Sequence, residues 1–219
     1  TSLKLIGEHV FEGCSSLKEI IIPPSVKEVG ISAFYDCTSL TSVSSSPDIT
    51  NMFFKYGQKL YKMTNIENNF EKAGVYYRMA ANQGHLGAMI NYGIMLEDGV
   101  GCAVNYEEAC KYYKMAADRG NMVALNNYGH MLHKGLGIAV DYEEACRCFK
   151  KASDCGIYDA MNNYGFMLDK GLGVEKNKEE ACILFKIAAD RGHIGAMNNY
   201  GHMLHKGQGC SVDYEEACK

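Results

Sequence analysis

Four histidines stand at a spacing that suits metal binding. His130 and His133 are three residues apart, and His202 and His205 repeat that spacing 72 residues later. On a helix such pairs lie on one face, and imidazoles are common zinc ligands. A zinc site needs further ligands, and no third ligand recurs at a matching position. We therefore expect no metal site and interpret these histidines as polar residues that line a surface groove.

Two other motifs resemble catalytic sequences only in their letters. Gly-x-Gly recurs at 99–101, 135–137, 171–173 and 207–209, but a dinucleotide-binding loop joins a strand to a helix and carries three glycines. Ser15 and Lys18 fit Ser-x-x-Lys, yet the partner motifs of that enzyme class are missing. No nucleophile is paired with a base. We predict no enzyme activity, no catalytic residue and no cofactor.

Composition and charge argue against two classes of partner. The chain has 219 residues and a net charge of −4, without the basic clusters that phosphate backbones attract. No apolar run approaches the roughly 20 residues that span a bilayer. We therefore expect neither nucleic-acid binding nor membrane insertion. The lack of an Asn-x-Ser/Thr sequon favours the cytoplasm, and the endoplasmic reticulum lumen and the cell surface stay open as alternatives.

The ten cysteines are placed as core residues rather than as a disulfide framework. Equivalent positions on packed helices lie about 8–10 Å apart, whereas a disulfide needs Cα atoms within about 7 Å. We therefore predict buried, reduced thiols at the recurring positions, and a buried thiol ladder for Cys14 and Cys37. The recurring cysteines, which are spaced by 36 residues, are Cys110, Cys146, Cys182 and Cys218.

A repeat of 36 residues organises most of the chain. Tyr-Gly recurs at 56–57, 92–93, 128–129, 164–165 and 200–201, and Glu-Glu-Ala-Cys at 107–110, 143–146, 179–182 and 215–218. Each repeat reads as two helices, A and B. Ala88, Tyr92 and Leu96 form one apolar face of helix A, which Gly99 ends. A glycine that recurs inside helix A, such as Gly93, predicts the close approach of the backbone of a neighbouring helix.

Helix B of each repeat has a clear start signal. Asn105 is a good N-cap, and Glu108 three residues later completes a capping-box pattern. The helix then buries an arc of small and aromatic residues. One hairpin cannot cover both of its apolar faces, so successive hairpins must stack. Residues 50–219 are therefore predicted to form a mainly α solenoid, with a degenerate first repeat and an incomplete last one that exposes apolar surface.

These repeats resemble a known family. The pattern Ala-x-x-x-Tyr-Gly-x-Met-Leu-x-x-Gly-x-Gly, then Asn/Asp-Tyr-Glu-Glu-Ala, then Tyr-x-x-Ala-Ala-x-x-Gly is similar to the Sel-1-like repeat, a relative of the tetratricopeptide repeat. The resemblance implies a right-handed α/α superhelical solenoid whose A helices line a concave surface. It also implies a role as a binding scaffold in signalling complexes or in quality control at the endoplasmic reticulum.

The N-terminal region has a different period. Residues 11–17 match residues 34–40 at a step of 23, which lies in the range of leucine-rich repeats. The stretch resembles the BspA-type leucine-rich repeat over residues 1–46, a short β-rich solenoid of about two turns. Because at least three repeats are normally needed for stability, we expect the natural protein to extend beyond this sequence.

The face of helix A opposite the buried residues is the candidate binding surface. Side-chain amides both donate and accept hydrogen bonds, so an asparagine ladder can hold a peptide backbone, while histidine and phenylalanine neighbours add selectivity. The alternative interpretation is that these asparagines bond to one another or to nearby backbone. The candidate partner-binding residues are Asn91, Asn127, His130, His133, Asn163, Phe166, Asn199, His202 and His205.

The sequence thus predicts a non-catalytic scaffold or adaptor that binds a peptide or a partner protein in the groove of the helical repeats. Two alternatives stay open. The chain is the regulatory region of a larger enzyme, such as a kinase or a ubiquitin-ligase complex, or it is a cell-surface adhesin. The full reading frame distinguishes them, because a catalytic signature would favour the first and an anchor the second.

Overall fold

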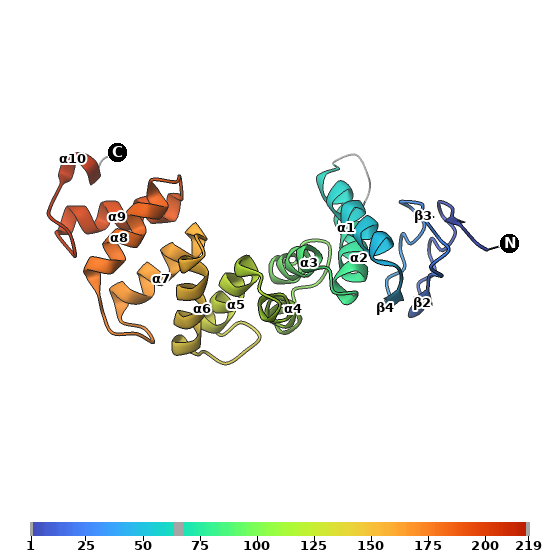
Figure 1. Ribbon diagram of the computed structural model, residues 1–219, viewed down its shortest axis with the longest axis horizontal. Helices are drawn as coiled ribbons and strands as arrows, with labels where there is room; N and C mark the ends of the chain where they lie inside the picture. Colours follow the sequence, from blue (N-terminus) through green and yellow to red (C-terminus); the bar gives the residue numbers. More distant parts are fainter. Residues whose placement is uncertain (1, 64–67, 218–219) are drawn as a thin grey trace. The chain divides into compact units, whose positions relative to one another are not determined.

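The computed structural model describes residues 2–63 and 68–217 and divides into two compact units, 1–116 (unit 1) and 117–219 (unit 2). Short strands precede a series of helices (Figure 1), which confirms the expected mainly α repeat fold with a β-rich start. The elements are β1 (Leu5–Ile6), β2 (Glu19–Ile21), β3 (Glu28–Val29), β4 (Ser42–Ser44), α1 (Pro47–Lys62), α2 (Asn69–Asn82), α3 (Leu86–Asp98), α4 (Tyr106–Asp118), α5 (Met122–Lys134), α6 (Tyr142–Asp154), α7 (Tyr158–Lys170), α8 (Lys178–Ala189), α9 (Ile194–Lys206) and α10 (Tyr214–Ala217).

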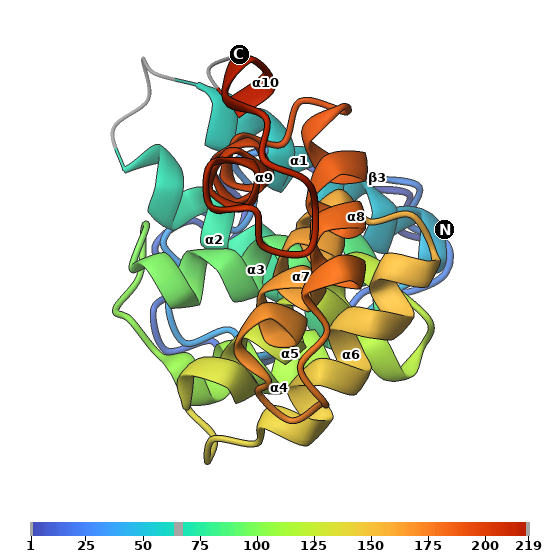
Figure 2. The same ribbon diagram turned by 90° about the vertical axis from the view of Figure 1, so that its left-hand side faces the viewer.

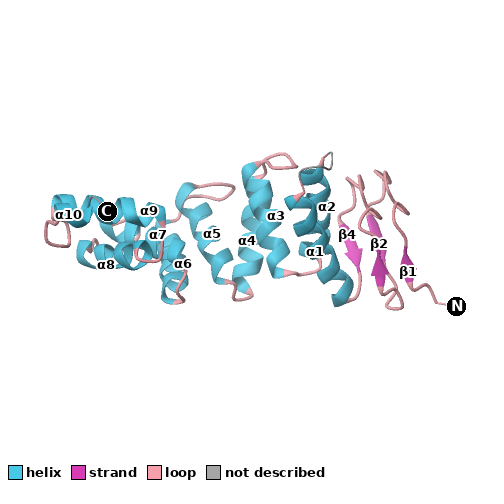
Figure 3. Ribbon diagram, turned by 90° about the horizontal axis from the view of Figure 1, so that it is seen from above, coloured by secondary structure: helices cyan, strands magenta, loops and turns pink. Residues whose placement is uncertain are grey.

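The strands of unit 1 pair in parallel at the period that the sequence predicts. Leu5 lies opposite Glu28 in the β1–β3 pair, and Glu19 lies opposite Ser42 in the β2–β4 pair, so each partner is 23 residues away. The repeat also stacks its side chains, because the rings of Phe11 and Phe34 are parallel with centroids 5.2 Å apart. Figure 3 shows the strands side by side, next to α1 and α2.

The expected buried thiol ladder in this region is wrong for one of its two members. Cys37 is fully buried, and its thiol donates to the Phe11 carbonyl. Cys14 is exposed. Among the described residues no further turn stacks on the outer side of the one that contains Cys14, so its side chain faces solvent.

The first helical hairpin, α1 and α2, covers the open end of the β turns through tyrosine hydroxyls. Tyr76 donates to the Ile31 carbonyl at 2.7 Å and accepts from the Phe34 amide at 3.3 Å. Tyr56 donates to the Val29 carbonyl at 2.6 Å. The buried ring of Tyr76 also contacts Phe53 on α1. One helical pair thus covers the apolar end of the β turns and also supplies hydrogen-bond partners for the backbone groups at that end.

The predicted N-caps of the B helices are present, but the capping box is not reciprocal. The Asn105 side chain accepts from the Glu108 amide at 3.0 Å. The Glu108 carboxylate does not return to the Asn105 backbone N–H, because that N–H already donates to the Leu96 carbonyl at the end of helix A. It accepts from the Asn105 side-chain amide instead. The same backbone bond recurs at Asp141 and Asn177.

Four of the five Tyr-Gly glycines inside the A helices make room for an aromatic ring and not, as expected, for a neighbouring backbone, whereas a Cβ on Gly201 would lie 3.3 Å from the backbone carbonyl oxygen of Ala217. A Cβ on Gly93 would lie 2.6 Å from the ring of Tyr113 on the following B helix. Any larger residue would push that buried ring away from its helix. The same contact links Gly57 with Tyr77, Gly129 with Phe149 and Gly165 with Phe185.

The Gly-x-Gly loops are packing elements. The first glycine of each ends helix A with a positive φ, 69° at Gly99, as predicted. The second lies against the start of the preceding B helix, since a Cβ on Gly173 would be 2.1 Å from the Tyr142 carbonyl oxygen. In unit 2, α6, α7 and α8 lie side by side (Figures 1 and 2). The loops thus need glycine for chain packing.

The recurring cysteines are buried as predicted at Cys110, Cys146 and Cys182, whereas Cys218 lies outside the described residues. All described cysteines are free thiols. Burial and a hydrogen bond with the Cys210 thiol raise the pKa of Cys182 to about 12. These side chains are therefore protonated, unreactive core groups at neutral pH.

Exposed apolar side chains occur on the last hairpin, as expected. On α9, Ile194 is 75% exposed and Met197 47% exposed. Tyr214 on the short α10 is 61% exposed. Within residues 2–63 and 68–217, none of the helices combines the length and the apolar character that crossing a bilayer demands.

Candidate partner-binding pockets

Unit 2 contains a surface pocket of about 190 Å³, here named the unit-2 pocket. It is lined by residues of the A helices α5, α7 and α9 and by one residue of the B helix α6. Five of the candidate residues lie in it, namely His130, His133, Asn163, Phe166 and Asn199. Its complete lining is His130, His133, Lys134, Phe149, Asn162, Asn163, Phe166, Met167 and Asn199.

Side-chain amides connect the A helices of unit 2 in one continuous hydrogen-bonded chain. Asn199 on α9 donates to Asn162 on α7 at 2.8 Å. Asn163, its neighbour on α7, donates to Asn126 on α5 at 2.9 Å. The longer bonds from Asn162 to Asn163 (3.5 Å) and from Asn126 to Asn127 (3.4 Å) complete this amide chain. The asparagines that bond between repeats, which are 37 residues apart, therefore hold successive A helices together.

The amide chain leaves hydrogen-bonding capacity at the pocket. A side-chain amide has two N–H groups and two acceptor positions. Asn163 uses one N–H on Asn126 and one acceptor position for Asn162. Its other N–H and lone pair are free to meet a polar ligand, and Asn163 is only half-buried. The ladder thus has a structural role and still offers binding groups.

His133 has an unusual environment at the edge of this pocket. Its ring lies edge-on to Phe166, with centroids 5.8 Å apart, and close to Tyr142. Its buried Nδ1 has no hydrogen-bond partner. Burial, followed by the charge of Lys134 and of His130, lowers the pKa of His133, so the ring is neutral at pH 7. No cluster of three possible metal ligands occurs within the described part of the chain.

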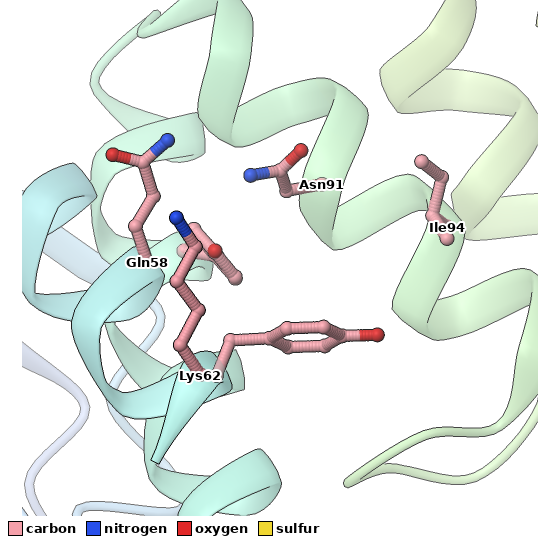
Figure 4. Close-up of a pocket in the computed structure, with 6 residues that line it drawn as sticks. Gln58, Lys62, Asn91 and Ile94 are labelled. Atoms are coloured by element: carbon pink, nitrogen blue, oxygen red, sulfur yellow. The ribbon is translucent and has the colours of Figure 1, made fainter.

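Unit 1 has a pocket of about 230 Å³, here named the unit-1 pocket. Figure 4 shows the side chains of Gln58 and Lys62 on α1 and those of Asn91 and Ile94 on α3 around it. Tyr77 of α2, which is 3% exposed, forms the floor, and the Asn91 amide beside its hydroxyl offsets part of the rise in the pKa of Tyr77 that burial causes. Tyr61 is the remaining lining residue.

The two pockets occupy the same place in the repeat. The number of each residue that lines the unit-1 pocket, increased by 72 (two repeats), is the number of a residue that lines the unit-2 pocket. The pairs are Gln58 and His130, Tyr61 and His133, Lys62 and Lys134, Tyr77 and Phe149, Asn91 and Asn163, and Ile94 and Phe166.

Three candidate residues lie outside these pockets. Asn127 is half-buried and accepts from the Asn126 side chain. His202 and His205 are exposed on α9, and the His205 ring lies 5.4 Å from that of Tyr214. The sequence pattern does not single out Asn126, which bonds to the pocket residue Asn163, or the lining residues Phe149, Asn162 and Met167. The dipeptide Asn-Asn at 126–127, 162–163 and 198–199 was the signal for the amide chain.

Comparison with protein-family models identifies both kinds of repeat. The Sel1 repeat matches residues 87–121, 123–157, 159–193 and 194–219, more than half of the chain. The BspA type leucine-rich repeat region, in six copies, matches residues 1–77. From residue 47 onwards that second match covers residues that belong largely to α1 and α2. No curated protein sequence matches the chain.

Solved structures support the same assignment. A Sel1 repeat protein from Oxalobacter formigenes is 28% identical with a TM-score of 0.71, over 79% of this chain and 70% of that protein. The protective antigen c5321 of uropathogenic Escherichia coli, which has an SLR fold, is 26% identical with a TM-score of 0.68, over 77% of this chain. The match spans 36% of that antigen's length.

A third structure, a Sel1 repeat protein from Klebsiella pneumoniae, shares the fold at 19% identity with a TM-score of 0.53, over 78% of this chain and 82% of that one. Sel1 repeat proteins are generally scaffolds for protein interactions. Family models and structures agree with the repeats read from the sequence. The chain belongs to the Sel1 repeat family and carries a BspA-type leucine-rich repeat region at its N-terminal end.

Proposed function

We propose that this chain is a non-catalytic scaffold that binds an extended segment of a partner protein along the exposed face of its A helices. One observation supports this most directly: the same six repeat positions form a pocket in each of the two units. A pocket that recurs with the repeat suits a ligand that is itself a chain, because each pocket can take one of its side chains.

The chemistry of the pockets fits this ligand. Each is about the size of one or two amino-acid side chains and has an aromatic floor beside an asparagine amide. The aromatic ring offers apolar contact, and the amide can bond to the ligand's backbone. The candidate residues in the pockets, Asn91, His130, His133, Asn163, Phe166 and Asn199, are the ones we propose to bind. Asn127, His202 and His205 stay candidates for contacts beyond the pockets.

The test is selection of binding peptides from a random library, followed by measurement of their affinity for variants. Replacing His130 and Phe166 together by alanine should weaken binding at least about tenfold, as expected for central contact residues. Neither side chain is fully buried, so the fold should persist. The matched control is Ile187→Ser, since Ile187 is a 42% exposed residue on the B helix α8.

Equal affinity for the His130/Phe166 variant, the control and the unaltered chain would reject this face as the binding surface. The amide-chain residues Asn126 and Asn162 are unsuitable for this test, because their loss also alters helix packing. A regulatory region of an enzyme and an adhesin would use the same face. The full reading frame separates those alternatives from a free-standing adaptor.

A further inference from the structure

The two pockets share three features while their other positions differ. Each has a buried aromatic floor, Tyr77 or Phe149, at 3% and 2% exposure. Each has an asparagine on the next A helix. Each has a lysine as the last residue of the preceding A helix, Lys62 or Lys134. The shared set indicates the part of a ligand that both pockets can recognise.

In the part of the chain that the structure describes, no carboxylate neutralises the positive charge of the two lysines. Within the described residues neither Lys62 nor Lys134 has an ion pair or hydrogen bond, and no carboxylate lines either pocket. An exposed ammonium group beside an apolar floor is therefore available to a carboxylate from outside.

The next repeat of unit 2 shows what the chain does when a carboxylate is present. Asp169 stands at the repeat position of Tyr61 and His133. Its carboxylate binds Lys170, the equivalent of Lys134, at 2.6 Å, and also Lys178 at 3.5 Å. Lys170 thus pairs with the carboxylate of the residue before it on the same helix, and it provides an in-chain control.

We propose that both pockets recognise a partner segment in which an apolar side chain stands next to an aspartate or glutamate. The apolar side chain packs against the exposed Ile94 or Phe166 and reaches the edge of the nearly buried ring of Tyr77 or Phe149 at the floor. The acidic side chain binds the ammonium group of Lys62 or Lys134, and Asn91 or Asn163 bonds to the ligand's backbone. This proposal rests on the proposed function and specifies the chemistry of its ligand.

The size of the effect follows from the exposure of the lysines. A solvent-exposed ion pair contributes little, on the order of 0.2–1 kcal/mol, which is about a 1.4- to fivefold change in affinity. Salt at about 0.5 M should remove most of it by screening. The apolar contact supplies the remaining affinity and should not depend on salt.

The experiment compares three dipeptides that differ by single groups. They are N-acetyl-Leu-Glu-amide, the neutral isostere N-acetyl-Leu-Gln-amide, and N-acetyl-Leu-Gln with a free carboxyl terminus. Binding is followed by NMR from the side-chain amide signals of Asn91 and Asn163, which report on each pocket separately. We expect dissociation constants on the order of millimolar, with the glutamate peptide about two- to fivefold tighter than the neutral one at low salt.

Lysine variants test whether Lys62 and Lys134 cause the preference for the glutamate peptide. Lys62→Met should abolish the preference for glutamate at Asn91 only, and Lys134→Met at Asn163 only. Lys170→Met should leave both unchanged. The proposal is overturned if the neutral peptide binds equally well, if no peptide shifts either signal, or if only the free carboxyl terminus gives a preference. Library peptides that bind through His130 and Phe166 but lack acidic residues would overturn it too, while leaving the proposed function standing.

Discussion

The unit-1 and unit-2 pockets hold the same asparagine in two different ways. In unit 1, the amide of Asn91 lies beside the hydroxyl of the floor residue Tyr77. In unit 2 the floor is Phe149, which has no hydroxyl, and Asn163 bonds to Asn126 of the preceding A helix. Phe54 occupies the unit-1 position that corresponds to Asn126. A half-buried amide needs a partner, and each unit supplies one from a different element.

The comparison shows which parts of the repeat are fixed by packing and which are open to change. The floor ring is required because it fills the space beside Gly57 or Gly129. The polar partner of the asparagine can come from the floor or from the neighbouring helix. Positions 58, 61 and 94 and their equivalents at 130, 133 and 166 change type freely, so they are the positions that can adapt a pocket to its ligand.

The floor rings should give the largest effect. Tyr77→Ala and Phe149→Ala each remove a buried ring and leave a cavity, and we expect each to lower the free energy of unfolding by about 3–5 kcal/mol. Urea denaturation gives the total, and hydrogen exchange shows which unit is affected. A cost below about 1 kcal/mol for either ring would contradict the equivalence of the two floors.

The amide chain should come next. Asn126→Leu removes the acceptor of Asn163 and should cost about 1–3 kcal/mol through the unpaired N–H. Adding Phe149→Tyr to this variant gives unit 2 the hydroxyl that Tyr77 supplies in unit 1. We expect the double variant to recover about 1 kcal/mol in urea denaturation. Without any recovery, the two ways of holding the asparagine would not be interchangeable.

A smaller effect is expected from the tyrosine hydroxyl alone. Tyr77→Phe keeps the ring but removes the hydroxyl beside Asn91, and should lower the free energy of unfolding by about 1 kcal/mol. Tyr61→Phe is the control, because Tyr61 is 38% exposed at the pocket edge. If both variants are equally stable, the Tyr77 hydroxyl beside Asn91 contributes nothing to the stability.

The smallest effect that we expect is a pH dependence of stability. It arises from His133, because Tyr61, its equivalent in unit 1, does not titrate near neutral pH. Burial and nearby charge lower the pKa of His133 in the folded chain, so protons bind the unfolded chain more readily. Its contribution to stability is complete above the unfolded value of about 6.5 and is lost as pH falls below it. His133→Gln should reduce the slope with which the free energy of unfolding of unit 2 falls as the pH is lowered below about 6.5. An unchanged slope in that variant would assign the loss to other groups.

Repeat positions were predictable from the sequence, whereas the contacts between them were not. The 36- and 23-residue steps predicted the helical hairpins and the parallel strand pairs, because a period fixes which residues are equivalent. The role of Gly93 was misjudged, since its spacing cannot tell a ring from a backbone. The expected bond from the Asn105 backbone N–H to the Glu108 carboxylate is absent for a similar reason. That N–H donates to the Leu96 carbonyl instead, a contact between two helices that the local sequence pattern does not reveal.

The candidate site was partly predictable for the same reasons. Helical periodicity placed Asn91, Asn163 and Phe166 on the exposed face, and the pockets contain them. Periodicity also selected His202 and His205, which the unit-2 pocket does not include. A pocket needs walls from two successive A helices and a floor from the B helix between them. The periodicity of a single helix therefore identifies the positions on its exposed face, but it does not show which of them line a pocket.

The tyrosine contacts that join α1 and α2 to the β turns carry an evolutionary consequence. Tyr56 and Tyr76 donate to main-chain carbonyls at Val29 and Ile31, groups that every residue possesses. Such a junction is indifferent to the side chains of the turn it meets. Two unrelated repeat arrays can thus be joined in one polypeptide with only a few tyrosine hydroxyl groups at the junction, and no separate adaptor domain is needed between them.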